Sequence, residues 1–237
     1  MRPRAILFDL DDTILAYGPR PLLLLELCEE IAERLTPLSA RIVADFLEGR
    51  LIDFWADEAR ANEWRRKIHE ARRMIIADAF AALRAEAPGL TPEVANAFAA
   101  RFSVLREGRQ VVFPNAVRVI ETIRAMNIKL ALVTNGAPET QRPKIERFDL
   151  ARHFDHIQIE GEAGFGKPDA RAYMHAMQAL GVGPHETWMI GDNLEWEVAA
   201  PQKIGIFALW HDHTGRGLPP GSPVIPDKII NDLGELL

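Results

Sequence analysis

The chain has 237 residues, 48% of them hydrophobic and 26% charged, which is the composition of a globular protein with a sizeable core. Its net charge of −6 gives no reason to expect nucleic acid as a partner, because a phosphate backbone is bound by a clustered positive field. The single cysteine, Cys28, excludes an internal disulfide and a thiolate zinc cluster, and it fits a cytoplasmic location.

The first predicted element is a short buried strand over residues 4–9. The apolar run that contains it is too short for a signal peptide and ends at Asp9. A second apolar run, "LLLLELC" at 22–28, falls far short of the ~20 residues of a membrane-spanning helix. We therefore expect this run to form the buried face of a helix, and we expect no membrane partner.

The next region, residues 20–107, has the pattern of helix throughout. Its breaks are expected at residues 36–37, at Gly49 and at 88–89, and a Thr-Pro pair starts the last helix. Roughly four helices joined by short loops favour a helical bundle. Because a strand precedes this bundle, we interpret the bundle as an insertion after the first strand of an α/β domain.

After residue 108, predicted strands and helices alternate. We expect strands over 128–135, 156–160, 187–192 and 206–210, and helices over 139–150, 169–181 and 194–205. This alternation is typical of a parallel sheet covered by helices on both faces. The Pro- and Gly-rich residues 215–227 are expected to form a surface loop.

Polar side chains gather after four of the predicted strands. In an open parallel sheet, ligands bind outside the carboxyl ends of the strands, so these side chains are expected to meet at one edge. They are Asp9, Asp11 and Asp12 after the first strand, Thr134, Asn135 and Gly136 after the second, Lys167 after the third, and Asp192, Asn193 and Glu197 after the fourth.

The chemistry of these residues favours a bound phosphoryl group. Asp9, Asp11 and Asp192 form an oxygen-rich cluster of the kind that holds Mg²⁺. Lys167 adds a second positive charge, and Thr134 with neighbouring backbone N–H groups offers donors to an anion. Such groups around a carboxylate are what phosphoryl transfer requires. One carboxylate of the pair Asp9 and Asp11 can attack phosphorus while the other handles protons.

These segments make the sequence resemble the haloacid dehalogenase superfamily of phosphohydrolases. The four signature segments occur in order as "DLDDT" (9–13), "VTN" (133–135), "GKPD" (166–169) and "GDNLEWE" (191–197). The resemblance implies an α/β fold with a Rossmann-like parallel-sheet core, formed by residues 1–16 and 107–237. The helical insertion, residues 17–106, resembles the C1-type cap domain of this superfamily.

Carried over position by position, the resemblance implies a role for each matching residue. Asp9 would be the nucleophile, and Asp11 the general acid and base. Thr134 would hold the phosphoryl oxygens, and Lys167 would steady the nucleophile. Asp192 would bind Mg²⁺ together with Asp9 and the backbone carbonyl of Asp11. The chain would then be a phosphatase that hydrolyses a small phosphorylated metabolite, of the phosphoglycolate, nucleotide or sugar phosphate type, through an aspartyl-phosphate.

Two positions bear on how far the resemblance extends. Glu197 stands where the superfamily commonly has a second aspartate, and it keeps the negative charge. Asp11 disfavours a dehalogenase, because the dehalogenases that the chain resembles lack an aspartate at this position.

Three residues are candidates for substrate binding with a structural alternative. Arg65 and Arg72 belong to a charged helix in the insertion, and we expect them either to reach an anionic substrate or to form ion pairs on a solvated helix. Asn135 either contacts the substrate or closes a turn.

Two further segments favour structural interpretations. Asp12 is expected to cap the next turn rather than to contact substrate. His211 and His213 flank Asp212 and suggest a second metal site, but they lack an evident third ligand. We interpret this segment as a loop near the active site.

Two other functions use the same residue types. A phosphomutase of the same fold needs a cap that excludes water and returns the phosphoryl group to its sugar. A phospho-acceptor binding domain without turnover, similar to the receiver domains of signalling proteins, also combines acidic residues, Mg²⁺, threonine and lysine. Receiver domains as a family lack the helical insertion, and their acceptor does not follow the first strand.

Overall fold

The structure is a computed structural model, and it describes residues 2–237 apart from the side chain of Glu58. Met1, the first residue of the predicted core, lies outside the described residues. The chain forms two compact units. The first, called the core, contains the residues up to Ala16 together with Val111–Leu237. The second, called the cap, contains Tyr17–Gln110, where the sequence predicts an insertion of residues 17–106.

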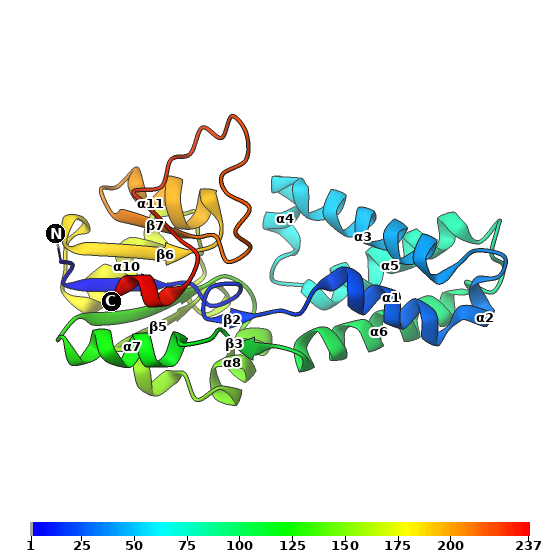
Figure 1. Ribbon diagram of the computed structural model, residues 1–237, viewed down its shortest axis with the longest axis horizontal. Coiled ribbons are helices and arrows are strands. Elements are labelled where there is room, and N and C mark those ends of the chain that lie inside the picture. The colour runs from blue at the N-terminus through cyan, green and yellow to red at the C-terminus, as the bar shows by residue number, and fades with distance from the viewer. Residues whose placement is uncertain (1) are drawn as a thin grey trace. The chain divides into compact units, whose positions relative to one another are not determined.

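The core is built on a six-stranded parallel sheet, which confirms the predicted α/β fold (Figure 1). Its strand order is β5-β4-β1-β6-β7-β8. The strands are β1 (Ala5–Phe8), β4 (Lys129–Thr134), β5 (His156–Ile159), β6 (Thr187–Gly191), β7 (Phe207–His211) and β8 (Lys228–Ile230). The first five were predicted, whereas β8 was not, because three residues after a Pro-rich segment give no periodic pattern.

Helices cover both faces of the sheet, and β1 shows how the sequence achieves this. Ile6 and Phe8 point to the face covered by α7 (Ala116–Ala125). Ala5 and Leu7 point to the face covered by α10 (Ala170–Leu180). All four strand residues are buried, since alternate side chains of a strand face opposite sides and each side is covered.

The order of the strands places a crevice beside β1. The chain passes from β1 to β4 on one side, and later places β6 on the other side of β1. Parallel sheets bind ligands at such a reversal of strand order, outside the carboxyl ends of the strands. The segments that follow β1, β4 and β6 therefore lie at the expected ligand-binding edge.

Two smaller features of the core were not predicted. A two-residue strand, β2 (Leu15–Ala16), pairs antiparallel with β3 (Val111–Val112) and joins the segment before the insertion to the segment after it. The expected helix over 194–205 is divided into a π-helical segment, η3 (Leu194–Ala199), and a short helix, α11 (Ala200–Gln202). The remaining α-helices of the core are α8 (Pro138–Arg147) and α9 (Glu160–Ala163).

The cap is helical, as predicted, and it has a hydrophobic core of its own. Its helices are α1 (Arg20–Glu30), α2 (Ala32–Leu35), α3 (Ala40–Ala56), α4 (Glu58–Trp64), α5 (Ile68–Leu83) and α6 (Pro92–Gly108). The expected break at Gly49 is wrong, because α3 continues through it. A break that was not predicted lies instead at residues 65–67, between α4 and α5. No helix within residues 2–237 has the length and apolar character needed to cross a membrane.

The two candidate arginines of the cap make contacts inside the cap. Arg65 follows α4 and donates a hydrogen bond to Oδ1 of Asn62 at 2.8 Å. Arg72, on α5, is only 9% exposed and pairs with Glu107 of α6 at 3.0 Å. Its guanidinium group also lies 5.6 Å from the centre of the Phe102 ring. These contacts support the ion-pair interpretation of Arg72 over direct contact with substrate.

We expect Arg72→Met to lower the free energy of unfolding by roughly 1–3 kcal/mol, because the change removes a charge-assisted hydrogen bond at a buried position. Urea unfolding of the variant would measure this loss. Arg73→Met is the matched control, since Arg73 is exposed on the same helix. Wild-type stability together with a raised KM would contradict the packing role and favour substrate binding.

Candidate active site

The acidic loop begins where β1 ends. The N–H group of Asp9 donates to the carbonyl of Ile190 at 3.0 Å, so the sheet holds the backbone of Asp9 directly. The loop then turns back, and the N–H groups of Ile14 and Leu15 both donate to the carbonyl of Leu10. The sheet therefore fixes Asp9 at the crevice, and this tight turn places two more carboxylates close behind it.

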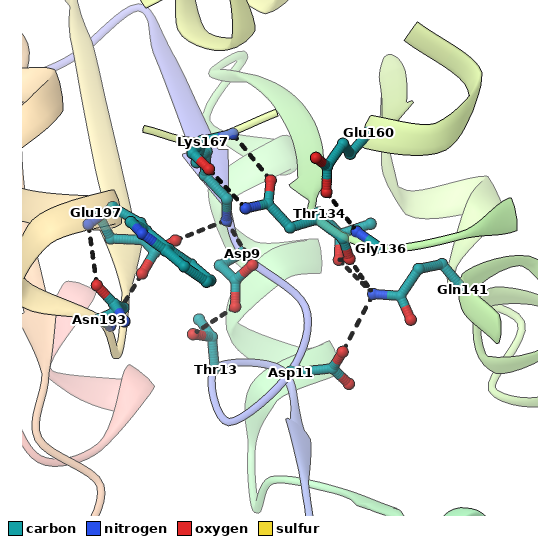
Figure 2. A network of polar contacts seen from close by, with 12 residues as sticks. Asp9, Asp11, Thr13, Thr134, Gly136, Gln141, Glu160, Lys167, Asn193 and Glu197 are labelled. Carbon is teal, nitrogen blue, oxygen red and sulfur yellow. Dashed lines mark hydrogen bonds and ion pairs between the residues drawn. The ribbon is translucent and has the colours of Figure 1, made fainter. Parts of the chain in front are cut away.

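Asp9 lies in a buried ion-paired cluster (Figure 2). Nζ of Lys167 lies 2.5 Å from Oδ1 of Asp9 and 2.7 Å from Oε1 of Glu197. The hydroxyl of Thr13 donates to Oδ2 of Asp9 at 3.4 Å. Lys167 and Glu197 are each 1% exposed, so water contributes little to their solvation. One ammonium group thus compensates two carboxylates in a low-dielectric site.

The pKa values of the cluster reflect burial first and the neighbouring charges second. Burial raises the pKa of Asp9, although Lys167 acts against this. Burial raises the pKa of Glu197 to about 7, again against the effect of Lys167. The pKa of Asp192 lies well above its ordinary value because of burial and the charges of Glu197 and Asp9. Burial alone would lower the pKa of Lys167, but these carboxylates outweigh it and raise the pKa.

Gly191 explains how the site accommodates a glutamate at position 197. A Cβ atom on Gly191, the last residue of β6, would lie 2.0 Å from Cγ of Glu197. The glycine therefore leaves the space that the longer side chain occupies. Oε2 of Glu197 accepts the N–H group of Asn193 at 2.9 Å, while its other oxygen faces Lys167. Glu197 thus connects the loop after β6 to the lysine.

We expect Gly191→Ala to destabilise the chain by roughly 1–3 kcal/mol, since the added methyl group overpacks a filled site. Gly49→Ala is the matched control: Gly49 lies in open space inside α3, so alanine there should stabilise the chain by about 0.5–1 kcal/mol. Thermal unfolding of both variants would test whether the first is less stable and the second more stable than the wild type. Equal stability of Gly191→Ala and the wild type would contradict the proposed packing.

Asn135 joins two loops of the site. Its side-chain amide donates to the carbonyl of Lys167 at 2.7 Å and accepts the N–H group of Lys167 at 2.8 Å. Both ends of the amide are therefore engaged, which supports a positioning role for this candidate substrate-binding side chain. The next residue, Gly136, has a positive φ of 116° and donates its N–H group to Glu160 at 3.0 Å.

Asp11 contacts two residues that were not predicted, and one of them also contacts Thr134. Nζ of Lys144 lies 2.9 and 2.7 Å from the two carboxylate oxygens of Asp11. Nε2 of Gln141 lies 3.1 Å from Asp11 and 2.6 Å from Oγ1 of Thr134 (Figure 2). Gln141 and Lys144 belong to α8, whereas the predicted site residues all follow strands. Only the packing of this helix brings them to the site.

A second acidic group lies next to the cluster. Asp12, Asp192 and His213 each offer one ligand atom, and these atoms lie within 4.8 Å of one another. Asp12 has a positive φ of 55° and lies in the tight turn before β2. His211 donates to the carbonyl of Asp12 at 3.2 Å, so it supports the acidic loop.

The donor set at this edge fits a hard divalent cation. It consists of carboxylate oxygens, which Mg²⁺ and similar ions prefer, and burial together with neighbouring carboxylates raises the pKa values of Asp9 and Asp192. The set of Asp9, Asp192 and the Asp11 carbonyl therefore remains our prediction for Mg²⁺. Asp12 is an additional carboxylate near this set, and the sequence did not predict it as a metal ligand.

Comparisons with known proteins identify the family that this chain resembles. Residues 3–205 match the family model described as haloacid dehalogenase-like hydrolase. The chain is 40% identical over 153 residues to phosphoserine phosphatase of Thermus thermophilus, which is 64% of this chain and 59% of that protein. It is 32% identical over 129 residues to N-acylneuraminate-9-phosphatase of Mus musculus, which is 54% of this chain and 52% of that protein. The chain thus spans between half and two thirds of the length of these relatives.

A solved structure is similar over nearly the whole chain. It is the putative HAD-hydrolase YfnB from Bacillus subtilis bound to magnesium, with a TM-score of 0.69 and 24% sequence identity. The alignment covers 100% of this chain and 97% of that one. This likeness concerns the fold.

Proposed function

The chain belongs to the haloacid dehalogenase-like hydrolase family, and we propose that it is a Mg²⁺-dependent phosphatase of small phosphorylated metabolites. The observation that carries the proposal is the buried pair of Asp9 and Lys167 at the switch point of the sheet, 2.5 Å apart. Asp11 follows two residues later on the same loop. A fixed carboxylate with a charge partner and a second carboxylate nearby are the groups that two-step phosphoryl transfer needs.

In the first step, an oxygen of Asp9 attacks phosphorus. The bond from phosphorus to the ester oxygen breaks, and a phosphoryl group remains on Asp9 as an aspartyl-phosphate. Asp11 donates a proton to the departing oxygen, so that an alcohol leaves. Lys167 holds Asp9 in place and neutralises charge on the transferring group.

In the second step, water attacks the phosphorus of the aspartyl-phosphate. Asp11 now accepts a proton from that water and returns to its protonated form. The bond between phosphorus and the Asp9 oxygen breaks, which releases inorganic phosphate and restores the carboxylate. The hydroxyl of Thr134 and the N–H groups of the loop after β4 bind the phosphoryl oxygens during both steps.

The residues that would hold Mg²⁺ are Asp192, Asp9 and the backbone carbonyl of Asp11, with Asp12 beside them. When bound, the ion supplies positive charge that neutralises phosphoryl oxygens and the surrounding carboxylates. Activity should therefore disappear in the presence of a chelator and return with added Mg²⁺.

We expect the metal-free chain to lose stability as the pH rises. The pKa of Glu197 is about 7 in the folded chain and 4.5 ordinarily, so the folded chain keeps a proton that the unfolded chain releases. The stabilisation is present below the ordinary pKa and is lost as the pH rises through the folded value. Asp192, whose pKa is also raised, acts in the same direction. The expected loss between about pH 5 and about pH 8 is on the order of 2 kcal/mol.

Urea unfolding at these two pH values, with a chelator or with Mg²⁺, would measure this dependence. Mg²⁺ should stabilise the chain more at the higher pH, because it competes with protons for the carboxylates. The variant Glu197→Gln should show a flatter pH dependence without metal. A metal-free stability that does not change with pH would contradict the raised pKa values described for the site.

The relatives support a small metabolite as substrate. Their names specify phosphoserine and N-acylneuraminate 9-phosphate chemistry, and a further relative, from Escherichia coli, is a pyrimidine 5'-nucleotidase. We therefore propose phosphomonoesters of amino acids, sugars and nucleotides as the class to test, with phosphoglycolate included.

A screen of these phosphomonoesters for phosphate release, with Mg²⁺ present or chelated, tests the proposal. We expect the wild-type chain to release phosphate from a subset of these compounds, and only when Mg²⁺ is present. A variant without Asp9 should release none. Adding a sugar bisphosphate should not be required, as it would be for a phosphomutase. Absence of phosphate release from every compound would refute the proposed function.

A further inference from the structure

Helix α8 directs two buried polar side chains at the catalytic loops. Gln141 and Lys144 are one turn apart on this helix, which places them on the same face. They are 2% and 9% exposed. Buried polar groups of this kind are retained only where partners satisfy them, and both side chains contact the catalytic loops: Lys144 contacts Asp11, and Gln141 contacts Asp11 and Thr134. The helix has apolar residues for packing, such as Ile145, so packing alone does not explain this pair.

Lys144 fixes the direction of the Asp11 carboxylate. Its ammonium group lies within hydrogen-bond distance of both carboxylate oxygens, at 2.9 and 2.7 Å. The side chain of Asp11 is 31% exposed, whereas that of Lys144 is 10% exposed. The partly exposed carboxylate is therefore held by both oxygens against a buried cation, which limits its rotation in a loop that follows the sheet.

Gln141 fixes the orientation of the Thr134 hydroxyl, because its side-chain NH₂ group acts as the donor. Nε2 of Gln141 faces Oδ2 of Asp11 at 3.1 Å and the carbonyl of Asn135 at 2.9 Å. Both of these oxygens are acceptors, so the amide must present its NH₂ group to them. The same nitrogen lies 2.6 Å from Oγ1 of Thr134. Because an amide nitrogen cannot accept a hydrogen bond, its two hydrogens are shared among three oxygens, and Oγ1 of Thr134 is an acceptor.

This arrangement has a consequence for Thr134. Its oxygen accepts from Gln141, so its own hydrogen is available to another acceptor. The carbonyl of Asn135 is a distant alternative, at 3.4 Å. A phosphoryl oxygen bound at this edge would be a closer acceptor, and it would receive the hydrogen without competition from Gln141.

We propose that Gln141 and Lys144 are positioning residues of the active site, Lys144 acting through Asp11 and Gln141 acting mainly through Thr134. Lys144 keeps the acid–base carboxylate aimed at the leaving oxygen. Gln141 keeps the threonine hydroxyl in the donor orientation toward the phosphoryl group. The inference rests on the proposed phosphatase function, and it adds two residues that the strand-end motifs do not contain.

The two roles differ in how they depend on the leaving group, which makes them separable. Phenyl phosphate needs a proton on its departing oxygen, whereas p-nitrophenyl phosphate releases a weakly basic oxygen that needs little help. Lys144→Met should therefore lower kcat about 100-fold for phenyl phosphate and clearly less for p-nitrophenyl phosphate. Gln141→Met should lower kcat by a similar factor, about tenfold or more, for both esters, because both carry the same phosphoryl group.

Three further variants complete the experiment. Lys144→Arg keeps the charge and should restore most of the activity on phenyl phosphate. Lys144→Gln is a second neutral variant in case Lys144→Met does not fold. Lys228→Met is the matched control, because Lys228 is exposed on β8 and donates to the carbonyl of Glu235. It should retain wild-type kcat on both esters.

The inference would be overturned if a folded Lys144→Met or Lys144→Gln variant kept wild-type kcat, or lost the same factor on both esters. A wild-type chain that hydrolyses neither ester, and releases phosphate from none of the phosphomonoesters of the screen, would refute the proposed function instead. In that event a crystal structure of the neutral Lys144 variant tests the positioning role. An Asp11 carboxylate that turns away from α8 supports the positioning role, and an unchanged carboxylate overturns it.

Discussion

Replacing Lys167 with methionine is expected to abolish phosphatase activity and to lower the free energy of unfolding by about 3–5 kcal/mol. Lys167 is the cation that the structure places against both Asp9 and Glu197. Its side chain is 1% exposed, so water does not replace it when it is removed. Methionine has nearly the same length and no charge, so the variant isolates the electrostatic effect from the loss of packing.

The stability deficit of Lys167→Met should shrink as the pH falls. Without the ammonium group, the buried carboxylates are less stable when ionised, so their pKa values rise further and protonation relieves the repulsion. Urea unfolding at about pH 5 and about pH 8 measures this change, and the deficit should be larger at the higher pH. Lys203→Met is the control, since Lys203 is 69% exposed. A deficit that is small, or equal at both pH values, would contradict the described charge balance.

Asp9→Asn is expected to lower kcat by roughly four orders of magnitude or more, because an amide oxygen is a poor nucleophile toward phosphorus. The change keeps the shape of the side chain, and Lys167 keeps its contact with Glu197. We therefore expect a folded protein whose unfolding free energy is close to that of the wild type.

Phosphate release and thermal unfolding of Asp9→Asn, measured in parallel, separate loss of chemistry from loss of fold. The isosteric change Asp11→Asn is the informative comparison, because it should impair protonation of the leaving group without removing the nucleophile. Wild-type phosphate release by Asp9→Asn would show that another group attacks phosphorus.

The arrangement of the core could be predicted because the sequence patterns of its strands and helices are local and repeated. The apolar run that ends at Asp9 indicates a strand buried on both faces, and later strands alternate with helical patterns. The strand β8 and the pair β2–β3 have two or three residues each, which is too short for a periodic pattern. Gly49 was expected to end a helix, but a single glycine costs only about 1 kcal/mol, and the packed face of α3 outweighs it.

The site could be predicted only where its residues follow strands. The rule that ligands bind at the carboxyl ends of parallel strands led to Asp9, Thr134, Lys167 and Asp192. Gln141 and Lys144 depend on how α8 packs, and His213 depends on the course of a loop after β7. The sequence contains these residues but gives no sign of their neighbours, since such contacts join segments more than a hundred residues apart, as for Lys144 and Asp11.

Chemical trapping of the covalent intermediate tests the role of Asp9 most directly. The wild-type chain, mixed with p-nitrophenyl phosphate and Mg²⁺ and quenched during turnover with borohydride, should contain homoserine at position 9, because hydride reduces an aspartyl-phosphate to the alcohol and releases phosphate. Asp9→Asn treated in the same way should give no modified residue. Homoserine at another aspartate, or steady turnover with position 9 never modified, would contradict the account.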